Sequence, residues 1–187
     1  MATKAALTWE EFLAAGRPDQ RWEYIGGEVR FMSPTGSRHG LVIRLIGKAL
    51  SRWEDLAAQW VCFGADVAFT MADGSWLCPD SAVVRRERYR EGIPEGPTPF
   101  PPDVAFEVYS PGDKASDVEK KRRLYYLSKV VQVWIDPETE TVEVISPDRP
   151  ARYFGSGETA VIEELPGFNM DLFPLEPGGR KKDDKTT

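Results

Sequence analysis

The sequence predicts a mixed α/β (α+β) domain, in which helices flank a central sheet. Three observations carry this prediction. Residues 38–58 repeat apolar side chains at helical spacing, which is typical of one long amphipathic helix. Short apolar runs at 103–108 and 130–135 are typical of buried strands, and the helical segment 115–128 lies between them. A helix of that length suits a crossover between parallel or neighbouring strands, so strands of both directions are expected in one sheet.

The N-terminal half begins with a short helix and a hairpin. Thr8 and Glu11 have the spacing of a capping box, so a helix is expected to start there and to stop near Gly16. Gly26-Gly27 separates two strand-like segments, which is a strong signal for a two-residue hairpin turn. Strands are predicted at 22–25, 28–32, 60–63, 65–70 and directly after Pro79.

The C-terminal half alternates loop, strand and helix. Residues 85–102 contain four arginines and many prolines and glycines, which predicts a surface loop. Residues 130–135 and 141–145 are expected to form a hairpin, with weaker strand signals at 152–154 and 160–162. We expect one domain over residues 1–176 and a disordered, charged tail over 177–187.

Composition narrows the classes of function. The chain has 187 residues, of which 41% are hydrophobic, enough for one domain with a substantial core. The net charge of −6 argues against indiscriminate nucleic-acid binding, although it leaves room for a local basic patch. Two cysteines are too few for a disulfide framework, which predicts the reducing cytoplasm. No apolar stretch approaches the ~20 residues of a membrane helix.

Two acidic residues, Asp80 and Glu107, stand out because each lies in an apolar run that predicts a buried strand. Period two places Glu107 on the same strand face as Ala105, and an acid in such apolar company is costly unless it is paired, protonated or bound to a metal. Asp80 follows Pro79 and opens the apolar run 81–84. Taken alone, Asp80 is also consistent with an ordinary turn residue. Glu107 alone is also consistent with a charged residue on an edge strand that faces water. Two carboxylates brought together would hold a hard cation such as Mg²⁺ or Mn²⁺.

The helix that follows Glu107 supplies a candidate lysine. At about 100° per residue, Lys121 falls within the apolar arc of segment 115–128, whereas Lys120 and Arg122 fall on solvated faces. Lys121 would steady developing negative charge at a reacting phosphate. The alternatives are a lysine whose aliphatic stem packs on the apolar side while its ammonium reaches water, and an i,i+4 salt bridge with Asp117.

The order and spacing of several short motifs resemble the Uma-type family of restriction-endonuclease-like proteins, in the PD-(D/E)XK nuclease superfamily. The resemblance extends over about residues 8–175. The motifs are Pro79-Asp80, the segments 106–111, 117–125 and 133–137, and in the N-terminal half 22–28, 32–34 and His39.

The resemblance implies a restriction-endonuclease-like mixed central sheet and assigns roles to residues. Asp80 and Glu107 would be the metal-binding acids, and Lys121 a lysine that has migrated to the helix. The superfamily pattern has a lysine two positions after the second acid, where this chain has Tyr109, so activity would depend on Lys121. The same resemblance marks Glu23 and His39 as additional site residues. Tyr125 is a further candidate for the site, and we expect the Val108 carbonyl as a third metal ligand. For His39, an ordinary surface position at a helix N-terminus is the alternative.

Together these features predict a Mg²⁺- or Mn²⁺-dependent endonuclease that hydrolyses phosphodiester bonds of DNA. The alternative is a catalytically inactive module that keeps the fold and binds nucleic acid or protein. A homodimer is expected, because duplex cleavage by such domains generally needs two active sites. The candidate nucleic-acid contacts are Lys120, Arg122, Arg85 and Arg86, with a solubilising surface as the simpler alternative.

Overall fold

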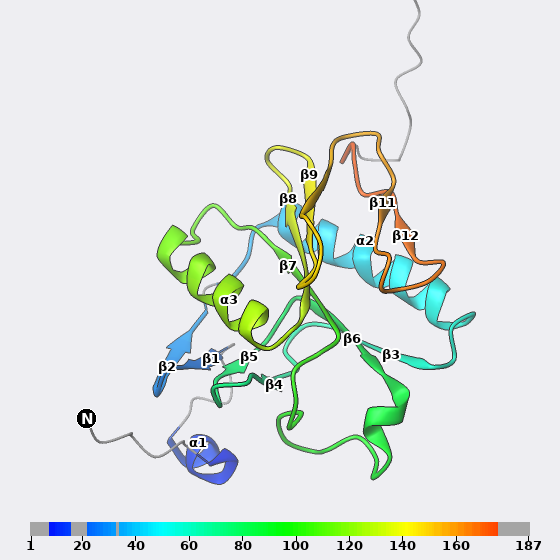
Figure 1. Cartoon of the computed structure of the whole chain (residues 1–187). Helices are drawn as coiled ribbons and strands as arrows, with labels where there is room; N and C mark the ends of the chain where they lie inside the picture. Colours follow the sequence, from blue (N-terminus) through cyan, green and yellow to red (C-terminus); the bar gives the residue numbers. More distant parts are fainter. Residues whose placement is uncertain (1–7, 16–21, 33, 176–187) are drawn as a thin grey trace, which may run out of the picture.

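The computed structural model describes residues 8–15, 22–32 and 34–175, so the predicted tail at 177–187 lies outside the described residues. Two long helices lie on opposite faces of a central sheet (Figure 1). The helices are α1 (Trp9–Ala15), α2 (Ser37–Glu54) and α3 (Ala115–Leu127), with a 3-10 turn η1 (Arg86–Tyr89). The strands of the central sheet are β3 (Trp60–Phe63), β6 (Ser81–Arg85), β7 (Val104–Val108), β8 (Val131–Asp136), β9 (Thr141–Ile145) and β10 (Arg152–Phe154). The remaining strands are β1 (Trp22–Ile25), β2 (Glu28–Phe31), β4 (Phe69–Thr70), β5 (Trp76–Leu77), β11 (Ala160–Val161) and β12 (Asn169–Met170).

The central sheet is mixed, with strand order β10-β9-β8-β7-β6-β3. Only β7 and β8 run parallel, and α3 is the crossover between them. The other neighbours are antiparallel. The predicted mixed α/β class and the crossover are therefore confirmed.

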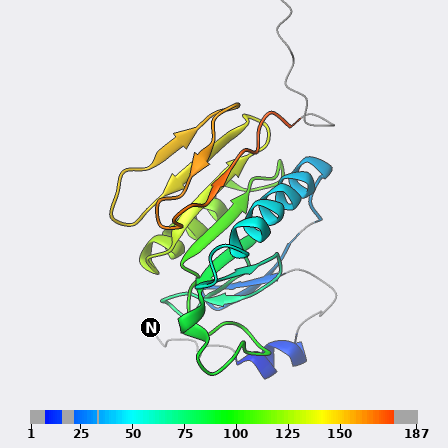
Figure 2. The same ribbon diagram turned by 90° about the vertical axis from the view of Figure 1, so that its right-hand side faces the viewer.

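The two faces of the central sheet carry separate apolar layers. Period two sends Val104, Phe106 and Val108 to the face covered by α2, where β11 and β12 also pack (Figure 2). Ala105 points to the other face, which α3 covers through Leu124 and Tyr125. Glu107 alternates onto this second face, so its carboxylate lies under α3.

A smaller sheet, in the order β2-β1-β5-β4, lies beside the central one. Its hairpin has the predicted turn, with φ of 59° at Gly26 and 87° at Gly27, values that suit glycine. Helix α1 starts at the predicted capping box, since Glu11 N–H donates to Thr8 Oγ1 and Thr8 N–H to Glu11 Oε2. An aromatic cluster of Trp9, Phe12, Trp22, Tyr24 and Trp76 joins α1 to this sheet.

Some predicted boundaries were wrong. The long helix ends at Glu54 instead of Ala58, because the N–H groups of Leu56 and Ala57 bond to carbonyls three residues back, which tightens the chain into turns. Of the predicted strand 65–70 only β4 forms, since Asp66 takes a φ of 72° and interrupts the extended chain. The predicted loop 85–102 begins with η1, and β12 was not predicted.

Within the described ranges, no helix combines the length and the apolar character that crossing a membrane requires.

Candidate active site

Sheet topology brings the two predicted acids to the same end of the central sheet. Asp80 directly precedes β6, and Glu107 is the second-last residue of β7. These strands are antiparallel, with Ser81 opposite Phe106, so the beginning of β6 lies beside the end of β7. Asp80 and Glu107 are both buried, at 4% and 6% exposure.

Lys121 bridges two of the buried carboxylates. Its Nζ lies 2.7 Å from Glu23 Oε1 and 3.2 Å from each carboxylate oxygen of Glu107. Glu23 comes from β1, so the ammonium links the small sheet, the central sheet and α3. The alternative, a salt bridge between Lys121 and Asp117, was wrong. Asp117 accepts a hydrogen bond from Arg30 at 2.7 Å and pairs with Lys120.

Tyr125, one turn further along α3, also contacts Glu107. Its hydroxyl donates to Glu107 Oε1 at 2.6 Å, and its side chain is fully buried. Lys121 and Tyr125 are an i,i+4 pair on one helix face, and together they orient the carboxylate of Glu107.

Asp80 is held by the backbone of β7 and by a histidine. Its Oδ2 accepts the Val108 N–H at 2.9 Å and lies 3.3 Å from His39 Nε2. His39 sits in the first turn of α2 yet is only 4% exposed, so the surface alternative was wrong. The antiparallel pairing of β6 with β7 places the Val108 N–H where it reaches Asp80.

The cluster contains more negative than positive charge, and the pKa values reflect this. Burial raises the pKa of Glu107 to about 7; Lys121 opposes the rise, while Asp80 and Glu23 add to it. Burial alone would lower the pKa of Lys121, but Glu107 and Glu23 outweigh it and raise this pKa well above the ordinary value. Burial, followed by Glu107, also raises the pKa of Tyr125. One buried lysine does not neutralise three neighbouring carboxylates.

This donor set fits a hard divalent cation in its chemistry. Asp80, Glu107 and Glu23 offer carboxylate oxygens, the ligands that Mg²⁺ and Mn²⁺ prefer. Burial, and after it the charges of Asp80 and Glu23, raise the pKa of Glu107, so a bound cation would favour its ionised form. Within the described residues, no three His, Cys, Asp or Glu side chains lie together as a metal site. The Lys121 ammonium pairs with both Glu23 and Glu107.

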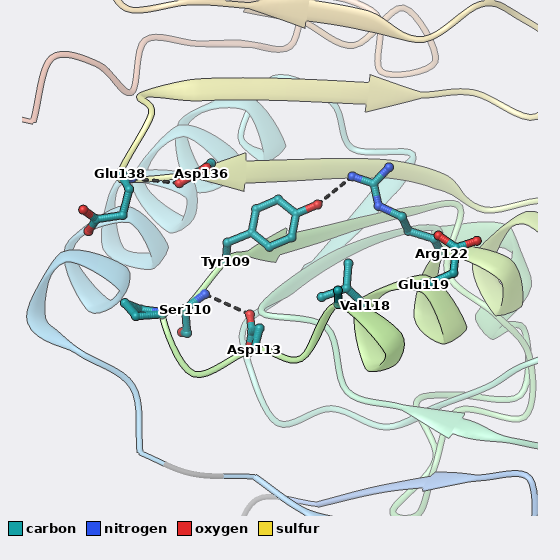
Figure 3. A pocket seen from close by; sticks show the side chains of 10 residues that line it. Tyr109, Ser110, Asp113, Val118, Glu119, Arg122, Asp136 and Glu138 are labelled. Carbon is teal, nitrogen blue, oxygen red and sulfur yellow. Dashed lines mark hydrogen bonds between the residues drawn. The ribbon is translucent and has the colours of Figure 1, made fainter.

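A pocket of about 500 Å³ opens at the ends of β7 and β8 and the start of α3, and none of Glu23, Asp80, Glu107 and Lys121 lines it (Figure 3). Tyr109, two residues after Glu107, lines it, and Ser110 donates its N–H to Asp113 at its edge. Arg122 closes one side of the pocket through a 2.6 Å hydrogen bond to the Tyr109 hydroxyl.

The prediction that Arg122 lies on a solvated face was wrong. Its guanidinium donates to Glu143 Oε2 at 2.5 Å, stands over the Trp134 ring, and leaves the side chain 24% exposed. Its partners come from the sheet, since β8 supplies Trp134 and β9 supplies Glu143.

The other predicted nucleic-acid contacts do not gather at the cluster. Lys120 is half exposed on the outer side of α3. Arg85 and Arg86 lie at the far end of β6, where Arg86 donates to the carbonyls of Ala58 and Trp60. The sequence did not single out Arg30, which joins the small sheet to α3 through its hydrogen bond to Asp117. No local sequence pattern predicts this contact, because Asp117 lies on another element.

The mixed central sheet flanked by helices is the fold that the resemblance implied. A solved structure with the same fold is titled a putative nuclease belonging to DUF820, from Anabaena variabilis ATCC 29413; it is similar at a TM-score of 0.72 and 19% identity, over 84% of this chain and 90% of that chain. No curated protein matches the chain.

The Uma2 family model, described as "Putative restriction endonuclease", matches residues 9–173. The chain belongs to this family, which confirms the resemblance found in its motifs.

Proposed function

We propose that the protein is a Mg²⁺- or Mn²⁺-dependent endonuclease that hydrolyses phosphodiester bonds of DNA. The observation that carries the proposal is the burial of Lys121 against Glu107 and Glu23 at the sheet end that also holds Asp80. A fold needs no such concentration of buried charge for its stability, because buried ion pairs contribute little to it. Buried charged groups with perturbed pKa values are instead typical of catalytic sites.

In this proposal Asp80 and Glu107 hold the cation, with the Val108 carbonyl as a third ligand. When bound, the cation supplies Lewis-acid stabilisation of the phosphate and a more acidic water. His39 and the Val108 N–H orient the carboxylate of Asp80, and Tyr125 orients that of Glu107. Lys121 stabilises the negative charge that develops on the phosphoryl oxygens.

The test is cleavage of plasmid and single-stranded DNA in Mg²⁺, Mn²⁺ or EDTA. We expect cleavage with either metal, none in EDTA, and a loss of at least about 10²-fold in Asp80→Asn. Asp55→Asn is the matched control, because it makes the same change at an exposed position at the end of α2. Undiminished cleavage in EDTA or by Asp80→Asn would refute the proposal. DNA binding without cleavage under every condition would favour the alternative, an inactive module that keeps the fold.

We also propose a homodimer in the cytoplasm. Edge strands β2 and β10 carry the exposed side chains Phe31 and Tyr153, which offer surfaces for pairing between copies. Both cysteines are free thiols, consistent with a reducing compartment. Light scattering at micromolar concentration should give twice the chain mass of 21.0 kDa; a monomer mass would remove the dimer and leave the catalytic proposal intact.

A further inference from the structure

The two ion pairs of Lys121 differ in what they leave available for a metal. Its ammonium lies 3.2 Å from each carboxylate oxygen of Glu107, so a cation bound by those oxygens competes with it. Its contact with Glu23 is shorter, at 2.7 Å to Oε1, and that glutamate comes from β1 of the small sheet. Lys121 therefore occupies one proposed metal ligand while a second carboxylate, on another sheet, also holds it.

Glu23 is fixed by the backbone that presents Asp80. It is 5% exposed, and its Oε1 also accepts the Cys78 N–H at 3.4 Å. Cys78 lies between β5 and β6, two residues before Asp80, so this short segment serves both acids. A fixed anion matters for Lys121, because a lysine is a point charge on a flexible stem and its ammonium lies where its partners hold it.

Binding of a divalent cation to Glu107 changes the partners of Lys121. Two positive charges on one carboxylate repel each other, so the ammonium loses its contacts with Glu107. Asp117, one helical turn before Lys121, is already bound to Arg30. Among the described residues, the ion pairs of Lys121 are with Glu107 and Glu23, so Glu23 is the carboxylate left to hold it.

Glu23 stands apart from the two proposed metal ligands. In the part of the chain that the structure describes, no three potential ligand side chains form one metal-binding group, so Glu23 does not join Asp80 and Glu107 in one. Its Oε1 already receives two donors, from Lys121 and Cys78. When all three acids are ionised, one divalent cation and one ammonium balance their charge, which gives each cation its own carboxylates.

We infer that Glu23 is a positioning residue, which holds Lys121 toward the reacting phosphate while Glu107 binds the metal. The inference rests on the proposed function, because it concerns the same site. Glu23 contacts neither the metal nor the phosphate and acts through Lys121. Without metal, Lys121 bridges the two glutamates as observed; with metal, it keeps Glu23 alone.

A crystal structure of the full chain with Mn²⁺ tests this arrangement, because the anomalous signal of manganese locates the ion. We expect the ion to be coordinated by Asp80 and Glu107, with Lys121 Nζ hydrogen-bonded to Glu23 and no longer to Glu107. A Glu23 oxygen on the ion, or Lys121 still bonded to Glu107, would overturn the inference and leave the proposed function intact. A cluster without the ion at saturating Mn²⁺ would refute the proposed function, and this inference with it.

A double-mutant cycle of DNA cleavage in Mg²⁺ gives a second test. Glu23→Gln keeps the size of the side chain and removes its charge. It should lower kcat by about 10²-fold with little change in KM, since displacing a catalytic charge by about 1 Å has an effect of this size. In the Lys121→Met background the same substitution should lower kcat no further, because the group that Glu23 positions is gone. A metal ligand or a merely structural residue would lower it again.

Glu28→Gln is the matched control, because it makes the same substitution at an exposed position on the same hairpin and should leave kcat unchanged. A wild-type kcat in Glu23→Gln, or a further loss of about 10-fold or more in the Lys121→Met background, would overturn the inference. The crystallographic test uses the unaltered chain, so it decides the question even if Glu23→Gln fails to fold.

Discussion

Lys121 and Arg122 are neighbours on α3, and each binds glutamate from a sheet strand. The net charge around the two side chains, however, differs. Lys121 lies among Glu23 and Glu107 with Asp80 close by, so negative charge is in excess. Arg122 meets a single carboxylate, Glu143, and its charge is balanced. Arg122 thus forms a balanced pair, whereas Lys121 lies in a cluster with excess negative charge, which the proposed function assigns to a metal ion.

The pKa values of the two glutamates follow this difference. Burial raises the pKa of Glu107 to about 7 in spite of Lys121. Burial would also raise the pKa of Glu143, but hydrogen bonds from Arg122 and Tyr153 outweigh it and lower the value. Ionised Glu143 therefore favours folding, whereas ionised Glu107 opposes it until another cation arrives.

The largest effect is expected on catalysis. Lys121→Met should lower DNA cleavage by ~10²–10³, since it removes a preorganised charge at the transition state. Arg122→Met should leave cleavage nearly unchanged and reduce the free energy of unfolding by about 1–3 kcal/mol, because it breaks a balanced pair. Cleavage assays beside denaturant unfolding check both variants.

Lys120→Met removes the same charge from the exposed side of α3 and is the control for helix charge. If it impaired cleavage as strongly as Lys121→Met, the distinction between the two sides of α3 would fail.

The two clusters should respond to pH in opposite directions. The folded pKa of Glu107 is raised from 4.5 to about 7, so its contribution to stability is complete below pH 4.5 and is lost as pH rises through 7, by roughly 3 kcal/mol. The pKa of Glu143 is lowered, so its contribution is present above its ordinary pKa and is lost as pH falls through the folded value. Unfolding free energies of Glu107→Gln and Glu143→Gln from pH 4 to 8 measure this, and parallel profiles would contradict it.

Metal should act on only one of the clusters. Mn²⁺ at about 100 times its Kd should stabilise the wild type by ~2.7 kcal/mol, seen as a higher Tm. The response should grow as pH rises through about 7, because protons compete for Glu107. Asp80→Asn combined with Glu107→Gln should abolish the response, and Glu143→Gln should retain it. A double mutant that still responds would place the metal elsewhere.

The smallest effect concerns two tyrosines that make the same bond in different surroundings. Tyr125 and Tyr153 each donate to a glutamate at 2.6 Å, but Tyr125 is buried and Tyr153 is 69% exposed. Tyr125→Phe should cost about 2 kcal/mol of unfolding free energy, since a buried charged acceptor loses its donor. Tyr153→Phe should leave the Tm unchanged, because water can replace the hydroxyl as a hydrogen-bond donor to Glu143. Equal shifts in Tm would show that burial does not set the strength of these bonds.

The sequence by itself determined the local elements and the faces that they bury. Helical periodicity predicted α2 and α3 and placed Lys121 on the buried side of α3. Strand alternation placed Glu107 on the face that α3 covers, and Gly26-Gly27 predicted the hairpin. These signals are readable because each depends on residues a few positions apart.

Only the tertiary structure decided which charges meet. Lys121 binds Glu23 and Glu107 instead of Asp117, its neighbour one helical turn away, and Arg122 turns toward β9. His39 is buried because β6 begins beside the first turn of α2. A helical wheel shows the side of a helix, but the partner on that side comes from strands distant in the chain, and burial lets Coulomb attraction outweigh local spacing.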